Sequence, residues 1–179
     1  KRLRGSVFAT WFGLVFLSMA THFLVIFISI EIVSISSYLL VASQKTARNF
    51  EAGIKYLIFG ATASAVMLYG ISMFYGITHS LNFIDKTFLH AIKSNSPGVI
   101  SIIWFMVMGG LLFKAAAAPF HNWVPDVYEA TPTPILSYLS YAPKIAAFLV
   151  LARFINASQV DLSLIIMVVA VCSLVIGNF

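Results

Sequence analysis

Three ionisable residues lie deep inside apolar stretches of the sequence: Glu31, Lys114 and Lys144. An unpaired carboxylate or ammonium at such a depth is costly, so each residue needs an opposite charge, a polar cavity or water. Ionisable residues within spanning helices commonly mark the paths of ions or protons. These residue types therefore indicate a proton path rather than bond-making chemistry.

A buried lysine of this kind can act as a proton switch. Apolar surroundings favour the neutral form of a lysine, whereas a nearby glutamate favours the charged form. A change in the distance between the two groups then makes the lysine hold or release its proton. A charge-gated proton pump requires this behaviour.

Hydroxyl groups follow two of these residues at helical spacing. Ser34 and Tyr38 stand three and seven residues after Glu31. A second stripe has the spacing i, i+3, i+4 and i+7, which is one face of a helix: Ser137, Ser140, Tyr141 and Lys144. Both stripes predict a polar, hydrated interior.

Two further residues are weaker candidates for the same path. His121 stands seven residues after Lys114 and shares its face if the backbone stays helical across Pro119. Lys55 lies near the start of another apolar segment, where its ammonium can also snorkel to the interface.

A packing role explains the same residues without transport. A buried glutamate and lysine can form a fixed ion pair, and serines can join helices by hydrogen bonds. Three central charges in a small set of spans exceed what packing usually tolerates, so transport is the favoured interpretation.

The composition predicts an all-α integral membrane protein. Hydrophobic residues make up 60% of the chain and charged residues only 9%, against roughly a quarter charged in soluble domains. The net charge of +5 fits topology-determining loops better than nucleic-acid binding. The single cysteine, Cys172, has no ligand partners at metal-binding spacing, so neither a metal nor an iron–sulfur site is expected.

The apolar runs predict about six transmembrane helices in one membrane domain, residues 1–179. Residues 6–43 are too long for one crossing and should turn at Thr21-His22, and the stretch 97–128 should break at Pro119 and Pro125. The predicted helices are 6–20, 22–43, 50–77, 98–118 with a half-helix at 119–128, 135–155 and 162–179, and the charged segment before Pro97 is expected to be a loop. The chain begins at Lys1 and stops within an apolar run, so we expect an internal fragment of a longer subunit.

One long motif resembles a known family. The sequence from Phe113 to Pro134 reads FKAAAAPFHNWVPDVYEATPTP, and Ala142-Pro143-Lys144 and Arg153 follow it. Together with Glu31, SYLL at 37–40 and EAGIKY at 51–56, this motif resembles subunit N of the proton-translocating NADH-quinone oxidoreductase, respiratory complex I, within the antiporter-like subunit family.

The resemblance implies a longer subunit with two inverted repeats of five helices, each contributing a proton half-channel around a broken helix. This chain would hold the first repeat and the start of the next helix. By position, Glu31 and Lys114 would form the coupling ion pair, and Lys144 would be the connecting lysine. Lys55 and His121 would be supporting groups.

The expected function is therefore proton translocation as a subunit of an NADH:quinone oxidoreductase in a bacterial inner membrane, coupled to quinone reduction elsewhere in the complex. No redox centre or cofactor is expected in this chain. The expected partners are other membrane subunits, lipid and protons, with no nucleic acid. The alternatives are a subunit of a sodium or potassium/proton antiporter and a non-conducting scaffold.

Overall fold

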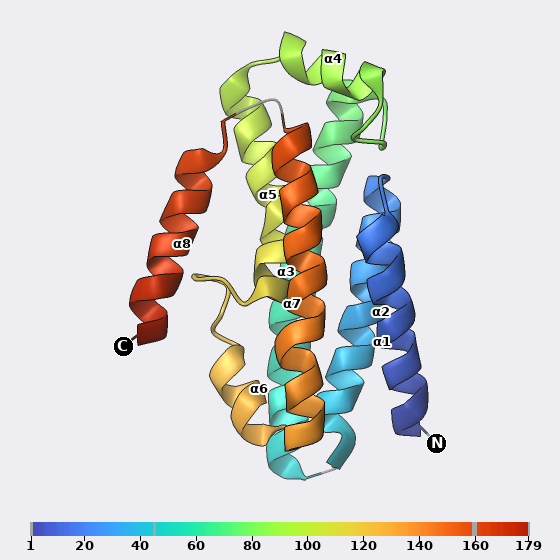
Figure 1. The fold of residues 1–179 in the computed structure, drawn as a ribbon, viewed down its shortest axis with the longest axis vertical. Helices are drawn as coiled ribbons and strands as arrows, with labels where there is room; N and C mark the ends of the chain where they lie inside the picture. Colours follow the sequence, from blue (N-terminus) through green and yellow to red (C-terminus); the bar gives the residue numbers. More distant parts are fainter. Residues whose placement is uncertain (1, 45, 159–160, 179) are drawn as a thin grey trace.

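Eight α-helices form the chain in a computed structural model that describes residues 2–44, 46–158 and 161–178 (Figure 1). A single 3-10 turn, Ala42–Gln44, follows the second helix. The helices are α1 Arg2–Met19, α2 Phe23–Val41, α3 Ala47–Thr78, α4 Lys86–Ser94, α5 Pro97–Ala115, α6 Val124–Ala130, α7 Thr133–Ala157 and α8 Ser163–Asn178.

The long helices run side by side as a bundle. Helix α1 packs on α2, α3 packs on α5 and α2, and α7 crosses α5. Four segments are long and apolar enough to cross a bilayer, and α1 and α8 supply shorter apolar helices. The described residues form no strand, only an isolated bridge between His22 and Asn82. The predicted all-α membrane fold is confirmed.

Close packing of α3 on α5 depends on small residues. A Cβ atom at Gly70 would lie 2.9 Å from Val107 Cγ2 of α5. Helices in a membrane associate mainly through such close van der Waals contact, because lipid tails are as apolar as the side chains. The absence of a side chain at Gly70 therefore allows α3 and α5 to approach closely.

The segment before Pro97 differs from the expected loop. Residues Lys86–Ser94 form α4, which caps one end of the bundle in Figure 1. Phe88 and Ile92, four residues apart, are buried in the core, while the charged side chains on the other face are exposed. The charges suggested a loop, but the apolar spacing is that of an amphipathic helix.

The predicted break in the helix after residue 97 is present but lies earlier. Helix α5 ends at Ala115, and Ala116 has the left-handed φ of 57°. The Ala117 N–H donates to the Leu112 carbonyl at 3.0 Å, which closes the helix end. The next helix, α6, begins at Val124 rather than residue 119. Pro119 disfavours helical backbone in the residue before it and cannot donate a hydrogen bond, so the chain leaves the helix before reaching it.

Candidate functional site

Lys114 occupies the last turn of α5 and is buried, with 5% of the residue exposed. The carbonyls at a helix C-terminus favour a positive charge. The Lys114 Nζ atom has no hydrogen-bond partner among the residues that the structure describes. It lies instead over three aromatic rings, 5.2 Å from Tyr38, 5.1 Å from Tyr56 and 5.4 Å from Phe113.

These three rings come from three helices and are called here the Lys114 cage: Tyr38 of α2, Tyr56 of α3 and Phe113 of α5. Tyr38 and Tyr56 meet edge to face with centroids 4.6 Å apart. Trp123, just before α6, stacks on Tyr56 at 4.3 Å and an interplanar angle of 15°. Rings on α2, α3 and α5, with Trp123 stacked behind Tyr56, thus fix the position of the ammonium.

Glu31 lies on α2, partly buried, near enough to Lys114 to act on its charge. The two residues form no ion pair within 4.0 Å. Ser64 of α3 donates a hydrogen bond to Glu31 Oε1. The structure therefore places the two residues of the expected coupling pair on two helices that both pack against α3, with the carboxylate held by a hydroxyl and the ammonium held by rings.

Lys144 lines a cavity of about 280 Å³ beside the broken segment, which contributes Ala116 and Ala118 to the lining. His121 and Tyr128 line the same cavity, and the Lys144 Nζ atom lies 5.6 Å from the Tyr128 ring. His121 Nδ1 and the Tyr128 hydroxyl are buried and find no hydrogen-bond partner in the described part of the chain. Such polar groups require water or a further polar partner.

His121 reaches this cavity by a different route from the expected one. The sequence analysis placed it on the Lys114 face of a continuous helix, but α5 ends at Ala115. The loop after Ala116 carries His121 to Lys144 instead. The Ala118 N–H donates to Ser173 Oγ of α8 at 3.0 Å, which ties this loop to the last helix.

Lys55 lies in a surface cluster of charges. Its Nζ atom is 2.9 Å from Glu51 Oε1 and 2.9 Å from Asp126 Oδ2, and its side chain is 41% exposed. A second pair, Arg48 with Glu129, joins the same two helices. These contacts, called here the α3–α6 clamp, hold the half-helix α6 against α3.

The hydroxyl stripe predicted around Lys144 does not line the interior of the described chain. Ser137 and Tyr141 are exposed. The Ser137 hydroxyl donates to the Thr133 carbonyl, and Ser140 donates to the Ser137 carbonyl. In the other stripe Ser34 likewise bonds to its own helix, at the Ile30 carbonyl. Of the predicted hydroxyl groups, Tyr38 is the one that touches Lys114.

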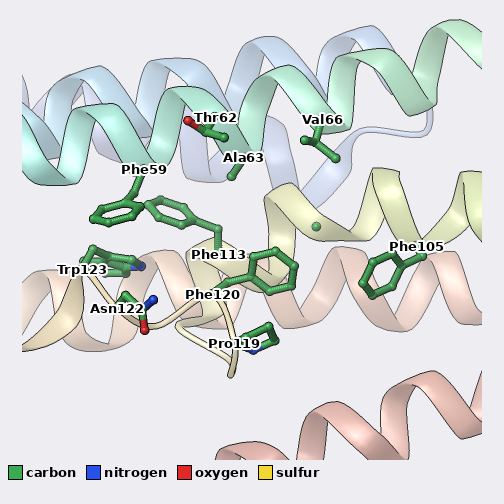
Figure 2. Close-up of a pocket in the computed structure, with 11 residues that line it drawn as sticks. Phe59, Thr62, Ala63, Val66, Phe105, Phe113, Pro119, Phe120, Asn122 and Trp123 are labelled. Atoms are coloured by element: carbon green, nitrogen blue, oxygen red, sulfur yellow. The ribbon is translucent and has the colours of Figure 1, made fainter.

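An apolar cavity of about 240 Å³ lies behind the cage, between α3 and the broken segment (Figure 2). Figure 2 shows Phe59, Phe113 and Trp123 gathered at one end, with Phe105 at the other. The residues that line this cavity include Thr62 and Asn122 but no ionisable side chain. Among the described residues no group of three His, Cys, Asp or Glu side chains could hold a metal ion.

Sequence reasoning missed Tyr56, Phe113, Trp123 and Ser64 as parts of the site. An aromatic residue in an apolar helix has no distinguishing pattern, because packing uses the same residue types. Ser64 ends a run of small residues in α3, GATAS at 60–64, where a serine is expected because small side chains let helices pack closely.

The fold and the site together define an all-helical membrane protein in which an interrupted helix carries a buried lysine, and a second helix packed on the same α3 carries a partly buried glutamate. The chain belongs to the family described as NADH:quinone oxidoreductase/Mrp antiporter, TM, whose model matches residues 20–179.

Similar proteins include NADH-quinone oxidoreductase subunit N 2 of Chloroherpeton thalassium, 40% identical over 93% of this chain and 35% of its own length. NAD(P)H-quinone oxidoreductase subunit 2 of the Paulinella chromatophora organellar chromatophore is 38% identical over 95% of this chain and 34% of its own length. The chain thus spans about a third of the length of these relatives.

Solved structures agree with this assignment. Respiratory complex I from Thermus thermophilus has a chain with a TM-score of 0.76 and 33% identity, covering 85% of this chain and 34% of that one. An archaeal membrane-bound sulfane sulfur reductase gives 0.73 and 28%, covering 83% and 30%. The predicted resemblance to subunit N is confirmed by the sequence relatives.

Proposed function

We propose that this chain is the first half-channel of a proton-translocating membrane subunit of an NADH-quinone oxidoreductase. The observation that carries the proposal is Lys114, a buried lysine without a hydrogen bond, placed at a helix break within electrostatic reach of Glu31. A group in this state changes its affinity for a proton when its distance to the carboxylate changes.

The expected proton-carrying groups are Glu31, Lys114 and Lys144. The first two lie on α2 and α5, which both pack against α3, and Lys144 borders a cavity at the broken segment together with His121. His121 supports transfer beside Lys144 through its unpaired Nδ1 atom. Lys55 has two carboxylate partners on the surface, and we assign it to holding α6 in place.

The wider assignment rests on the names of the similar proteins. It comprises a bacterial inner membrane, partner membrane subunits, surrounding lipid, and electron transfer to quinone elsewhere in the complex. The family description also includes antiporters, but the two sequence relatives named above are quinone oxidoreductase subunits, and this favours the respiratory assignment. A sodium dependence of transport would favour the antiporter instead.

The test uses the full-length parent subunit carrying Lys114→Ala, assembled in its complex in inverted membrane vesicles. Quinone reduction and the pH gradient are followed in the same sample. We expect the gradient to fall at least about ten-fold, the effect of roughly 1.4 kcal/mol or more on the transfer barrier. Loss of the ammonium leaves the path without its central proton carrier.

Lys93→Ala is the matched control, because Lys93 is exposed at the end of α4. It should leave both rates unchanged. Wild-type rates in an assembled Lys114→Ala complex would refute the proton-path proposal. A lowered yield of complex, with normal pumping per assembled complex, would assign Lys114 to packing.

A further inference from the structure

The Lys114 ammonium has two different kinds of partner within its reach. One is the Glu31 carboxylate, and the other is the cage of rings over which it lies in this structure. We infer that the Tyr38 and Tyr56 rings hold the Lys114 ammonium while it is separated from Glu31. This inference rests on the proposed function and names the positioning residues of that path.

The geometry of the cage suits a cation. All three ring centroids lie within about 6 Å of the nitrogen, the range in which the negative ring face attracts a positive charge. The attraction is larger where water is excluded, and Lys114 and Tyr56 are both buried. The rings thus replace part of the hydration that the ammonium loses.

Glu31 has its own partner in the same arrangement. Its Oε1 atom accepts the Ser64 hydroxyl, so the carboxylate is also stabilised when the ammonium is not bound to it. When Glu31 and Lys114 are separated, the carboxylate therefore keeps its hydrogen bond from Ser64 and the ammonium keeps its contact with the rings. Neither charge is left bare in the apolar interior.

The backbone makes room for one of the rings. A Cβ atom at Gly60 would lie 1.8 Å from the Tyr38 hydroxyl and 2.8 Å from its Cζ atom. Any side chain at position 60 therefore forces the Tyr38 ring away from its place beside Tyr56. Trp123 supports the other ring by stacking on Tyr56, so the broken segment also helps to shape the cage.

The cage lowers the cost of moving the charge. With Glu31 as the sole partner, separation would place an ammonium in an apolar site, which is prohibitive. With rings available, the same proton-bearing lysine can rest in two positions and pass from one to the other. The tyrosines act through their ring faces and carry no proton themselves.

The test replaces Tyr56 in the full-length subunit by phenylalanine, then by phenylalanines with increasing ring fluorination. This series keeps nearly the same shape while it weakens and then reverses the negative ring face. Tyr56→Phe should pump within about two-fold of wild type. The most fluorinated ring should lower the pH gradient per electron transferred by about ten-fold, since it removes a cation–π contact that is strongest where water is excluded.

Tyr38 provides an independent pair, Tyr38→Phe and Tyr38→Leu, for which the phenylalanine should restore the pumping that the leucine loses. Gly60→Ala should resemble Tyr38→Leu. The control is Tyr69→Leu, because Tyr69 lies on α3 with 60% of its surface exposed. All variants are compared per assembled complex, and this comparison removes effects on folding.

The outcomes separate the two proposals. If Lys114→Ala abolishes the gradient while fluorination at position 56 has no effect, the cage inference is wrong and the proposed function stands. If Tyr56→Phe is as damaging as the fluorinated ring, the hydroxyl rather than the ring face matters, and the inference is wrong. If Lys114→Ala pumps normally, both proposals fail together.

Discussion

The exposed lysine of this chain, Lys55, has carboxylate partners, whereas the buried lysine, Lys114, has none among the described residues. Lys55 is on the surface, with its side chain 41% exposed, and has two carboxylates at 2.9 Å. Lys114 is 5% exposed and forms no ion pair within the described chain. An exposed pair contributes little, about 0–1 kcal/mol, whereas an unpaired buried charge is costly. The difference indicates that Lys55 fastens a helix while Lys114 is held ready to change state.

The two environments lie next to each other on one helix. Lys55 and Tyr56 are consecutive residues of α3, and successive side chains of a helix point about 100° apart. Lys55 therefore reaches outward to Asp126, while Tyr56 turns inward under the Lys114 ammonium. The clamp sets the position of α6, and Trp123 at its start stacks on Tyr56. The surface charges thus support the buried site through packing.

Replacing each lysine by arginine should give the largest difference between the two. Arginine keeps the positive charge but does not release its proton at any working pH. Lys114→Arg should therefore reduce the pH gradient at least about ten-fold, whereas Lys55→Arg should keep its ion pairs and pump normally. The measurement is the gradient in inverted vesicles, normalised to assembled complex. Equal behaviour of the two variants would remove the distinction.

Neutralising a glutamate beside each lysine should give a smaller but clear contrast. Glu31→Gln removes the acidic partner of Lys114, so the lysine loses the group that changes its proton affinity, and the gradient should fall several-fold, a change of about 1 kcal/mol. Glu51→Gln leaves Lys55 paired with Asp126 and should change little. A Glu51→Gln variant that pumps as poorly as Glu31→Gln would place the clamp on the proton path.

The smallest effect is expected from the clamp itself. A double-mutant cycle of Lys55→Ala with Asp126→Ala should give only a small coupling in the free energy of unfolding, because the pair is exposed to solvent. Unfolding of the purified full-length subunit in mixed detergent micelles measures this. Added salt should weaken the coupling. A large coupling that added salt does not weaken would mean that the clamp is shielded from solvent in the full-length subunit.

Hydrophobic patterning was enough to predict most of the helices, because a segment that spans a bilayer must satisfy its backbone internally and be apolar along its length. The break near Pro119 was also predictable, since proline cannot donate to the helix. Helix α4 was not, because its charged residues hid the spacing of Phe88 and Ile92. The buried charged residues could be identified from the sequence because an ionisable side chain within a long apolar run is rare.

The sequence by itself thus determined which residues bear charge inside the membrane, and it placed Glu31, Lys114 and Lys144 on separate helices. Only the tertiary structure decided what surrounds each of them. His121 moved from the Lys114 face to the Lys144 cavity because α5 ends at Ala115. Of the rings over Lys114, Tyr38 and Tyr56 stand 76 and 58 residues before it in the sequence, whereas Phe113 is its direct neighbour. Contacts between helices depend on packing angles and register, which local sequence does not encode.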